Sequence, residues 1–303
     1  MIAQTSLSPR AWAELLLLSV IWGASFLSIR VALDEVPVFT SVAHRVGWAA
    51  LILWIVVWIR GIPLPRNPQV WGAFLVMGLL NNIVPFSLMA WGQLHIETGL
   101  TSIFNATTAI MAVLVAAAVF PDERLTPNRL AGVCIGFLGV ATAIGFGALT
   151  DFDIRSLAQM AILAGAFSYA LAGAWGRTTL KGLRPELAAA GMLTASAVVI
   201  VPAAWMIDGP IRLDLTPHTI AAIGYYSAIA TAFAYLLYYR VLAMAGSGNL
   251  LLCTLLIAPV AIVLGALILD ETLPPRAFWG FGILALGLVI LDGRVLRPRH
   301  KIG

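Results

Sequence analysis

The sequence predicts an all-α membrane protein in which ten transmembrane helices form two inverted five-helix repeats. Three observations predict this fold: the composition, the number of long apolar runs, and a repeated segment. The chain has 303 residues, of which 61% are hydrophobic and only 11% are charged, whereas a soluble domain carries roughly 25% charged residues. The mean hydropathy is +0.96. These values exclude soluble globular, disordered, collagen-like and disulfide-rich secreted proteins.

Ten apolar runs are long enough to cross a bilayer, since a core of about 30 Å needs about 20 residues in a helix that rises 1.5 Å per residue. The predicted spans are residues 11–33, 39–59, 69–91, 98–120, 128–148, 156–176, 186–207, 217–239, 246–269 and 276–293. None alternates between polar and apolar residues as a barrel strand does, so helices are expected. The first run is longer than the apolar core of a signal peptide, and we interpret it as a retained span.

The basic residues predict the orientation of the spans. With these boundaries, 13 of the 18 Lys and Arg residues fall on the side of the two termini and 5 fall on the other side. The positive-inside rule therefore places both termini in the cytoplasm. The net charge of +4 is explained by this bias, so the expected partner is the lipid bilayer and not a nucleic acid. Neither cysteine lies in a Cys/His cluster, and we expect no metal and no cofactor.

A repeated segment divides the chain into two halves. Residues 120–127 recur as residues 268–275, an offset of 148 residues. Two glycine pairs share this offset, Gly132 with Gly280 and Gly139 with Gly287. We therefore expect one repeat in residues 1–150 and a second in 151–303. Because each half has an odd number of spans, the second enters the membrane from the opposite side. Inverted repeats are typical of secondary transporters, whose substrate site lies near the midplane between the halves.

Several residues resemble one family over essentially the whole chain. Trp22-Gly23 in the first span, Arg45 in the second, and the paired segments 122–127 and 270–275 look like the drug/metabolite transporter superfamily, EamA branch, and within it the YddG-type amino-acid exporters. This resemblance implies export of small neutral or zwitterionic metabolites, foremost amino acids including aromatic and hydrophobic ones, by alternating access across the bacterial inner membrane. Other exporters of the superfamily, including multidrug exporters, remain open, as does an intramembrane enzyme or scaffold.

The sequence lacks enzyme motifs, and it lacks one proline that the repeat leads us to expect. The sequence contains no HExxH, GxSxG, P-loop or dinucleotide-binding motif, so we expect no catalytic residue and no enzyme. One departure from the family pattern is that Met111 stands where the second half has Pro259, which argues against helix breaks at matching places in the two halves.

The candidate substrate site is neutral and aromatic. Unpaired amides in lipid are costly, so Asn81 and Asn82, which precede Pro85, must face protein or a water-filled cavity. Thr101, Asn105 and Thr108 follow the spacing of one helix face. The candidate substrate-binding residues are Trp22, Ser25, Asn81, Asn82, Phe86, Thr101, Asn105, Thr108, Tyr169, Trp175 and Tyr235. Contacts between packed helices are the alternative role for these side chains.

Three ionisable residues are candidates for gating or coupling: Glu14, His44 and Arg45. Glu14 lies near the cytoplasmic end of its span, where an interfacial role is the alternative. Arg45 is expected to snorkel to the outer interface or to pair with Asp34 or Glu35, with an external gate as the alternative. No buried Arg or Lys is then available, which disfavours substrates that carry a phosphate.

Glycines are frequent in spans five and ten: Gly132, Gly136, Gly139, Gly280, Gly282 and Gly287. Such residues let helices approach closely. They predict close packing within one chain, with a homodimer contact as the alternative to a monomer.

Overall fold

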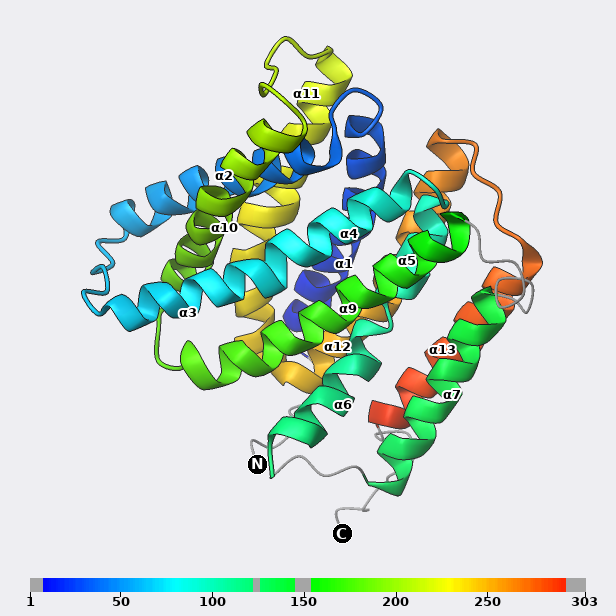
Figure 1. Cartoon of the computed structure of the whole chain (residues 1–303). Coiled ribbons are helices and arrows are strands. Elements are labelled where there is room, and N and C mark those ends of the chain that lie inside the picture. Colours follow the sequence, from blue (N-terminus) through cyan, green and yellow to red (C-terminus); the bar gives the residue numbers. More distant parts are fainter. Residues whose placement is uncertain (1–7, 122–125, 145–153, 293–303) are drawn as a thin grey trace.

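The computed structural model describes residues 8–121, 126–144 and 154–292, and these residues form helices without any strand (Figure 1). In the first half the helices are α1 (Pro9–Ala32), α2 (Val38–Ile59), α3 (Pro68–Gly78), the π-helix η1 (Leu79–Ile83), α4 (Val84–Gln93), α5 (Thr98–Asn105), α6 (Thr108–Val119) and α7 (Pro127–Ile144). In the second half they are α9 (Ile154–Thr179), α10 (Pro185–Ile207), α11 (Pro217–Gly224), the π-helix η2 (Tyr225–Phe233), α12 (Ala234–Ile268) and α13 (Pro275–Asp292).

All ten predicted spans lie on these helices. Within the part of the chain that the structure describes, seven helical segments are long and apolar enough to cross a membrane, among them Pro68–Gln93, which joins α3, η1 and α4. The other three spans fall on α7, on the second part of α12 and on α13; the last four residues of the fifth span, 145–148, lie outside the described residues. The all-helical membrane fold is therefore confirmed.

Two element boundaries differ from the prediction. The expected break between spans eight and nine is absent, because α12 continues from Ala234 to Ile268 with Pro259 inside it. Span four is instead interrupted between Asn105 and Thr108. At this interruption the hydroxyls of Thr107 and Thr108 donate to the carbonyls three residues earlier, at 2.7 Å each. Such bonds compete with the helical ladder, so the break occurs in the half that lacks the proline.

Equivalent helices of the two halves run antiparallel. In the α2–α10 pair, Thr40 contacts Asp208 at one end and Arg60 contacts Glu186 at the other. In the α7–α13 pair, which lies side by side in Figure 1, Gly139 faces Leu284 and Gly136 faces Gly287. Two equivalent helices can be antiparallel only if the halves are inverted. The predicted inverted arrangement is therefore confirmed, while the expected boundary at residue 150 lies outside the described residues.

The first helix of each half packs against helices of the other half. Helix α1 packs against α12 and η2, just as α9 packs against α6 and α4 (Figure 1). The apolar core accordingly lies along these seams between the halves, with one large cluster around α5, α7, α9 and α13 and another between α2 and α10.

The glycine-rich faces of spans five and ten meet inside the chain. A Cβ atom on Gly139 would overlap the backbone nitrogen of Leu284, and one on Gly287 would come within 2.5 Å of the backbone nitrogen of Gly136. A Cβ atom on Gly282, in contrast, would meet no described atom outside its own helix within 4 Å. The close packing expected within one chain is therefore present, and the monomer or homodimer alternatives stay a prediction.

Candidate functional site

The middle of span three contains a π-helical turn that frees a backbone carbonyl. In π geometry the acceptor of residue 85 would be Leu80, but Pro85 has no N–H to donate. The hydroxyl of Ser168 on α9 donates to the Leu80 carbonyl instead, at 2.7 Å. This contact joins the two halves at the π turn that contains Asn81 and Asn82.

Around this turn, a network of neutral polar side chains joins span three to spans seven and eight. Asn81 Nδ2 donates to the Tyr235 hydroxyl at 3.0 Å. That hydroxyl donates to Asn82 Oδ1 at 3.0 Å, and Asn82 Nδ2 donates to Ser196 Oγ at 2.9 Å. The structure thus brings three of the predicted site residues together, Asn81, Asn82 and Tyr235, and adds Ser196. We call these four residues the central polar network.

The two amides of the network differ in what they leave available. Asn82 is fully buried, and the nitrogen and the oxygen of its side-chain amide each form a hydrogen bond with the protein. Asn81 is half-buried, and within the part of the chain that the structure describes its Oδ1 has no protein donor. Asn81 therefore keeps an acceptor for another molecule, whereas Asn82 holds the helices together.

Arg45 lies close enough to the central polar network to interact electrostatically with Tyr235, and it does not lie at the outer interface. Its Nε donates to Thr231 Oγ1 on η2 at 3.0 Å, and its Cζ lies 3.8 Å from the centroid of the Phe86 ring. The Phe86 ring packs edge-to-face on Tyr169, with centroids 6.5 Å apart. The guanidinium thus joins two more predicted site residues, Phe86 and Tyr169, in the interior.

This placement corrects the expectation for Arg45. The carboxylates proposed as its partners are used elsewhere, because Asp34 pairs with Arg30 at 2.5 Å and Glu35 accepts from Thr216. A cation–π contact and a hydroxyl acceptor hold the cation inside the bundle instead. A half-buried arginine therefore lies inside the bundle, and the expectation that the interior offers no Arg or Lys is wrong.

The other predicted aromatic residues lie apart from the central polar network. Trp22 Nε1 donates to the Ala230 carbonyl of η2 at 3.1 Å, and the Ser25 hydroxyl donates back to the Trp22 carbonyl at 2.7 Å. Trp175 Nε1 donates to the Ala73 carbonyl of α3 at 3.1 Å. Each indole therefore ties the first span of one half to a span of the other half.

The predicted polar stripe on span four is not continuous. Thr101 is fully buried and donates to the Glu97 carbonyl at 3.2 Å. Asn105 and Thr108 are half-buried, but the interruption between α5 and α6 separates them. They therefore do not form the single helix face that their spacing predicts.

The two other gating candidates have local partners. Glu14 pairs with Arg10 at 3.2 Å and with Arg240 at 2.5 Å, which ties the start of α1 to α12. His44 is buried, and its Nδ1 accepts from Trp48 at 3.2 Å. Neither side chain contacts the central polar network.

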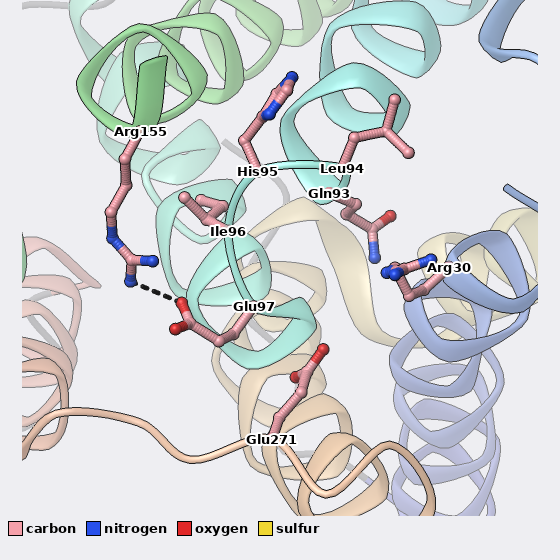
Figure 2. Close-up of a pocket in the computed structure, with 8 residues that line it drawn as sticks. All are labelled: Arg30, Gln93, Leu94, His95, Ile96, Glu97, Arg155 and Glu271. Carbon is pink, nitrogen blue, oxygen red and sulfur yellow. Dashed lines mark hydrogen bonds and ion pairs between the residues drawn. The ribbon is translucent and has the colours of Figure 1, made fainter. Parts of the chain in front are cut away.

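A pocket of about 240 Å³ lies at the end of the bundle where α1 ends and α9 begins, which we call the outer end after its predicted orientation. Figure 2 shows Glu97 and Glu271 on one side of the pocket, and Arg30 and Gln93 on another. Arg155 of the second half pairs with Glu97 of the first at 2.7 Å. Glu271 accepts from the backbone nitrogens of Thr98 and Gly99, at 2.9 and 3.3 Å, and so caps α5. These contacts fasten the halves together at the outer end.

The pattern of contacts between two inverted halves agrees with the comparison with known proteins. Two stretches of the chain, residues 11–145 and 156–291, each match the EamA-like transporter family. The chain belongs to this family. It is accordingly a multi-pass membrane transporter and not an enzyme.

Two relatives of this EamA-family transporter are similar to it over nearly their whole length. A "Probable terminal-alkyne amino-acid exporter" of Streptantibioticus cattleyicolor is 26% identical, covering 97% of each chain. A "Probable amino-acid metabolite efflux pump" of Escherichia coli is 25% identical, covering 95% of this chain and 97% of the relative. One protein of known crystal structure superposes with a TM-score of 0.67 at 16% identity, over 96% of this chain and all of the other, which shows a shared fold.

In this EamA-family transporter, the residues predicted for the site did not include Ser168, Ser196 or Thr231, because single hydroxyl residues in apolar runs carry no distinctive signal. Glu271 could have been found, since it belongs to the segment that repeats between the halves. Arg45 was identified, but its neighbours Thr231 and Phe86 come from other spans, so its direction could not be read from local sequence.

Proposed function

We propose that this transporter exports small neutral or zwitterionic metabolites, foremost amino acids including aromatic and hydrophobic ones, by alternating access. It would do so across a bacterial inner membrane with both termini in the cytoplasm. The observation that carries the proposal is the central polar network, in which neutral amides and hydroxyls of both halves meet in the membrane interior. A substrate held there would contact both halves, and their rocking would expose it to either side.

The chemistry of the network suits a molecule with polar ends and an apolar side chain. Amide groups supply donors and acceptors together, and Asn81 has an acceptor to spare. The half-buried ring of Tyr169, which packs on the buried ring of Phe86, offers aromatic surface, against which an apolar side chain would pack. The names of the relatives from S. cattleyicolor and E. coli support amino acids as the first class to test.

We expect the substrate to bind weakly. Most polar groups of the network already have protein partners, so few are left for a ligand. A dissociation constant in the high micromolar to millimolar range corresponds to about −4 to −6 kcal/mol. Weak binding also lets an exporter release its cargo.

Counterflow in proteoliposomes tests the function directly. Vesicles containing the purified protein are loaded with one amino acid at a time and then given a radiolabelled trace of the same compound. We expect at least one aromatic or hydrophobic amino acid to accumulate above protein-free vesicles, and Asn81→Leu to reduce that uptake. Exchange of a sugar phosphate or a cationic drug without exchange of any amino acid would contradict the proposal.

A further inference from the structure

Arg45 is a cation inside the membrane-spanning part of the bundle. It lies seven residues after Val38, the first residue of α2, and at 1.5 Å per residue this is about 10 Å along the helix. Charged side chains at such depth are costly and generally mark a function. The groups around its guanidinium therefore indicate what Arg45 does.

No protein anion neutralises this cation. The ionisable groups that interact with it electrostatically are Tyr169, Tyr226 and Tyr235, and phenols are neutral near pH 7. Among the residues that the structure describes, no carboxylate forms an ion pair with Arg45. The site around Arg45 thus carries one uncompensated positive charge.

The guanidinium also has donors to spare. Of its five N–H groups, the one on Nε donates to Thr231. The two terminal nitrogens donate to no acceptor within the described ranges, and the side chain is half-buried, not sealed. The Phe86 ring covers the guanidinium at 3.8 Å. The edge that carries the two terminal nitrogens is left free for a ligand. An arginine binds a planar carboxylate through this edge, by two parallel hydrogen bonds.

We propose that Arg45 anchors the carboxylate of the transported molecule, so that the transporter selects organic carboxylates. This inference rests on the proposed export function and specifies its substrate class. A carboxylate carries one negative charge and neutralises the site. A phosphate monoester carries about −1.5 to −2 charges at pH 7 and would leave excess negative charge, while an amine without a carboxylate would be repelled by Arg45.

Three compounds that share one ring separate these possibilities: phenylalanine, 3-phenylpropionate, which lacks the amine, and phenethylamine, which lacks the carboxylate. Phenyl phosphate is added as the phosphate probe. For each we measure the shift in melting temperature of the purified protein and the inhibition of counterflow. We expect phenylalanine and 3-phenylpropionate to raise the melting temperature and to inhibit, and phenethylamine and phenyl phosphate to do neither.

Variants of Arg45 assign the effect to this residue. Arg45→Gln should weaken the apparent affinity for both carboxylates by about 30-fold or more, as for a charge-assisted bidentate pair, and Arg45→Lys should retain part of it because the charge remains. The matched control is Arg212→Gln, which removes an exposed arginine from a loop and should change nothing. A melting temperature of unliganded Arg45→Gln close to that of the wild type would show that the variant folds.

The outcomes separate this inference from the proposed function. If amino acids are exchanged but phenethylamine inhibits as well as 3-phenylpropionate, or Arg45→Gln keeps the wild-type affinity, the anchor is wrong while the export function stands. If no carboxylate shifts the melting temperature of the wild type, the anchor is also wrong. If carboxylates shift it through Arg45 but no amino acid is exchanged, the anchor stands and the proposed function fails.

Discussion

At the scale of single residues, neighbours in the sequence take different roles in the site. Asn81 and Asn82 are adjacent, yet only Asn82 is fully buried with its amide used at both ends. Composition and depth predicted that both amides would lie inside. Which of them faces the protein depends on Tyr235 and Ser196, which are more than 100 residues away, and local sequence does not contain that information.

The two asparagines should therefore respond differently to the same substitution. Asn82→Leu deprives Tyr235 of its acceptor in the interior, and such a loss costs about 1–3 kcal/mol of unfolding free energy. Asn81→Leu should lower transport with a smaller effect on stability, because Asn81 is half-buried. Melting temperatures and counterflow of both variants check this. A larger loss of stability for Asn81→Leu than for Asn82→Leu would contradict the assignment.

Glu35, in the loop between α1 and α2, makes a pH-dependent contact. Hydrogen bonds from the hydroxyls of Thr219 and Thr216 lower its pKa below the ordinary value of 4.5. The contact therefore stabilises the fold fully above pH 4.5, and this stabilisation is lost as the pH falls through the lower folded pKa. We expect Glu35→Gln to lower the melting temperature at pH 7 and to match the wild type more closely near pH 3. An equal difference at both pH values would argue against this contact.

At the scale of helices, irregular turns position the site. An irregularity near η1 is consistent with the local sequence, because Pro85 has no N–H to donate to the preceding turn. The interruption of span four was not predicted, because it arises from hydroxyls of Thr107 and Thr108 that bond back to their own helix. Pro259, a stronger local signal, lies inside the uninterrupted α12, since tertiary packing overrides local preference.

The close approach of α7 and α13 is the element contact most sensitive to substitution. Gly139→Val should lower the unfolding free energy by about 1–3 kcal/mol, because the added atoms meet the backbone of Leu284 and Gly280. Gly282→Val on the same pair of helices is the matched control, since a Cβ atom there would meet no described atom outside its own helix within 4 Å. Melting temperatures of the two variants decide. Equal melting temperatures would show that α7 and α13 can move apart without loss of stability.

At the scale of the whole molecule, the sequence predicted the inverted halves from a parity argument and a charge count. The structure supplies independent support through α2 and α10, which run antiparallel from Thr40–Asp208 to Arg60–Glu186. The contacts that close the outer end could not be predicted in the same way. Glu97 directly precedes α5 and Arg155 lies in the first turn of α9, and their pairing depends on how the assembled halves fit together.

The orientation in the membrane stays a prediction that cysteine labelling checks. Single cysteines at Ala3 and Gly303, in a chain without Cys134 and Cys253, should resist a membrane-impermeant maleimide applied to intact cells. Both should react after the cells are permeabilised. Labelling of either cysteine in intact cells would contradict the orientation inferred from the basic residues.

Alternating access requires the two halves to move against each other around the central polar network, and a cross-link at the outer end would prevent this movement. In a chain without Cys134 and Cys253, Glu97→Cys and Arg155→Cys place one thiol on each half where the two side chains now pair, and a short reducible bis-thiosulfonate reagent can join them. We expect counterflow to stop while the link is intact and to return after reduction, with each single-cysteine variant unaffected. Exchange at the full rate through the cross-linked protein would contradict alternating access by these two halves.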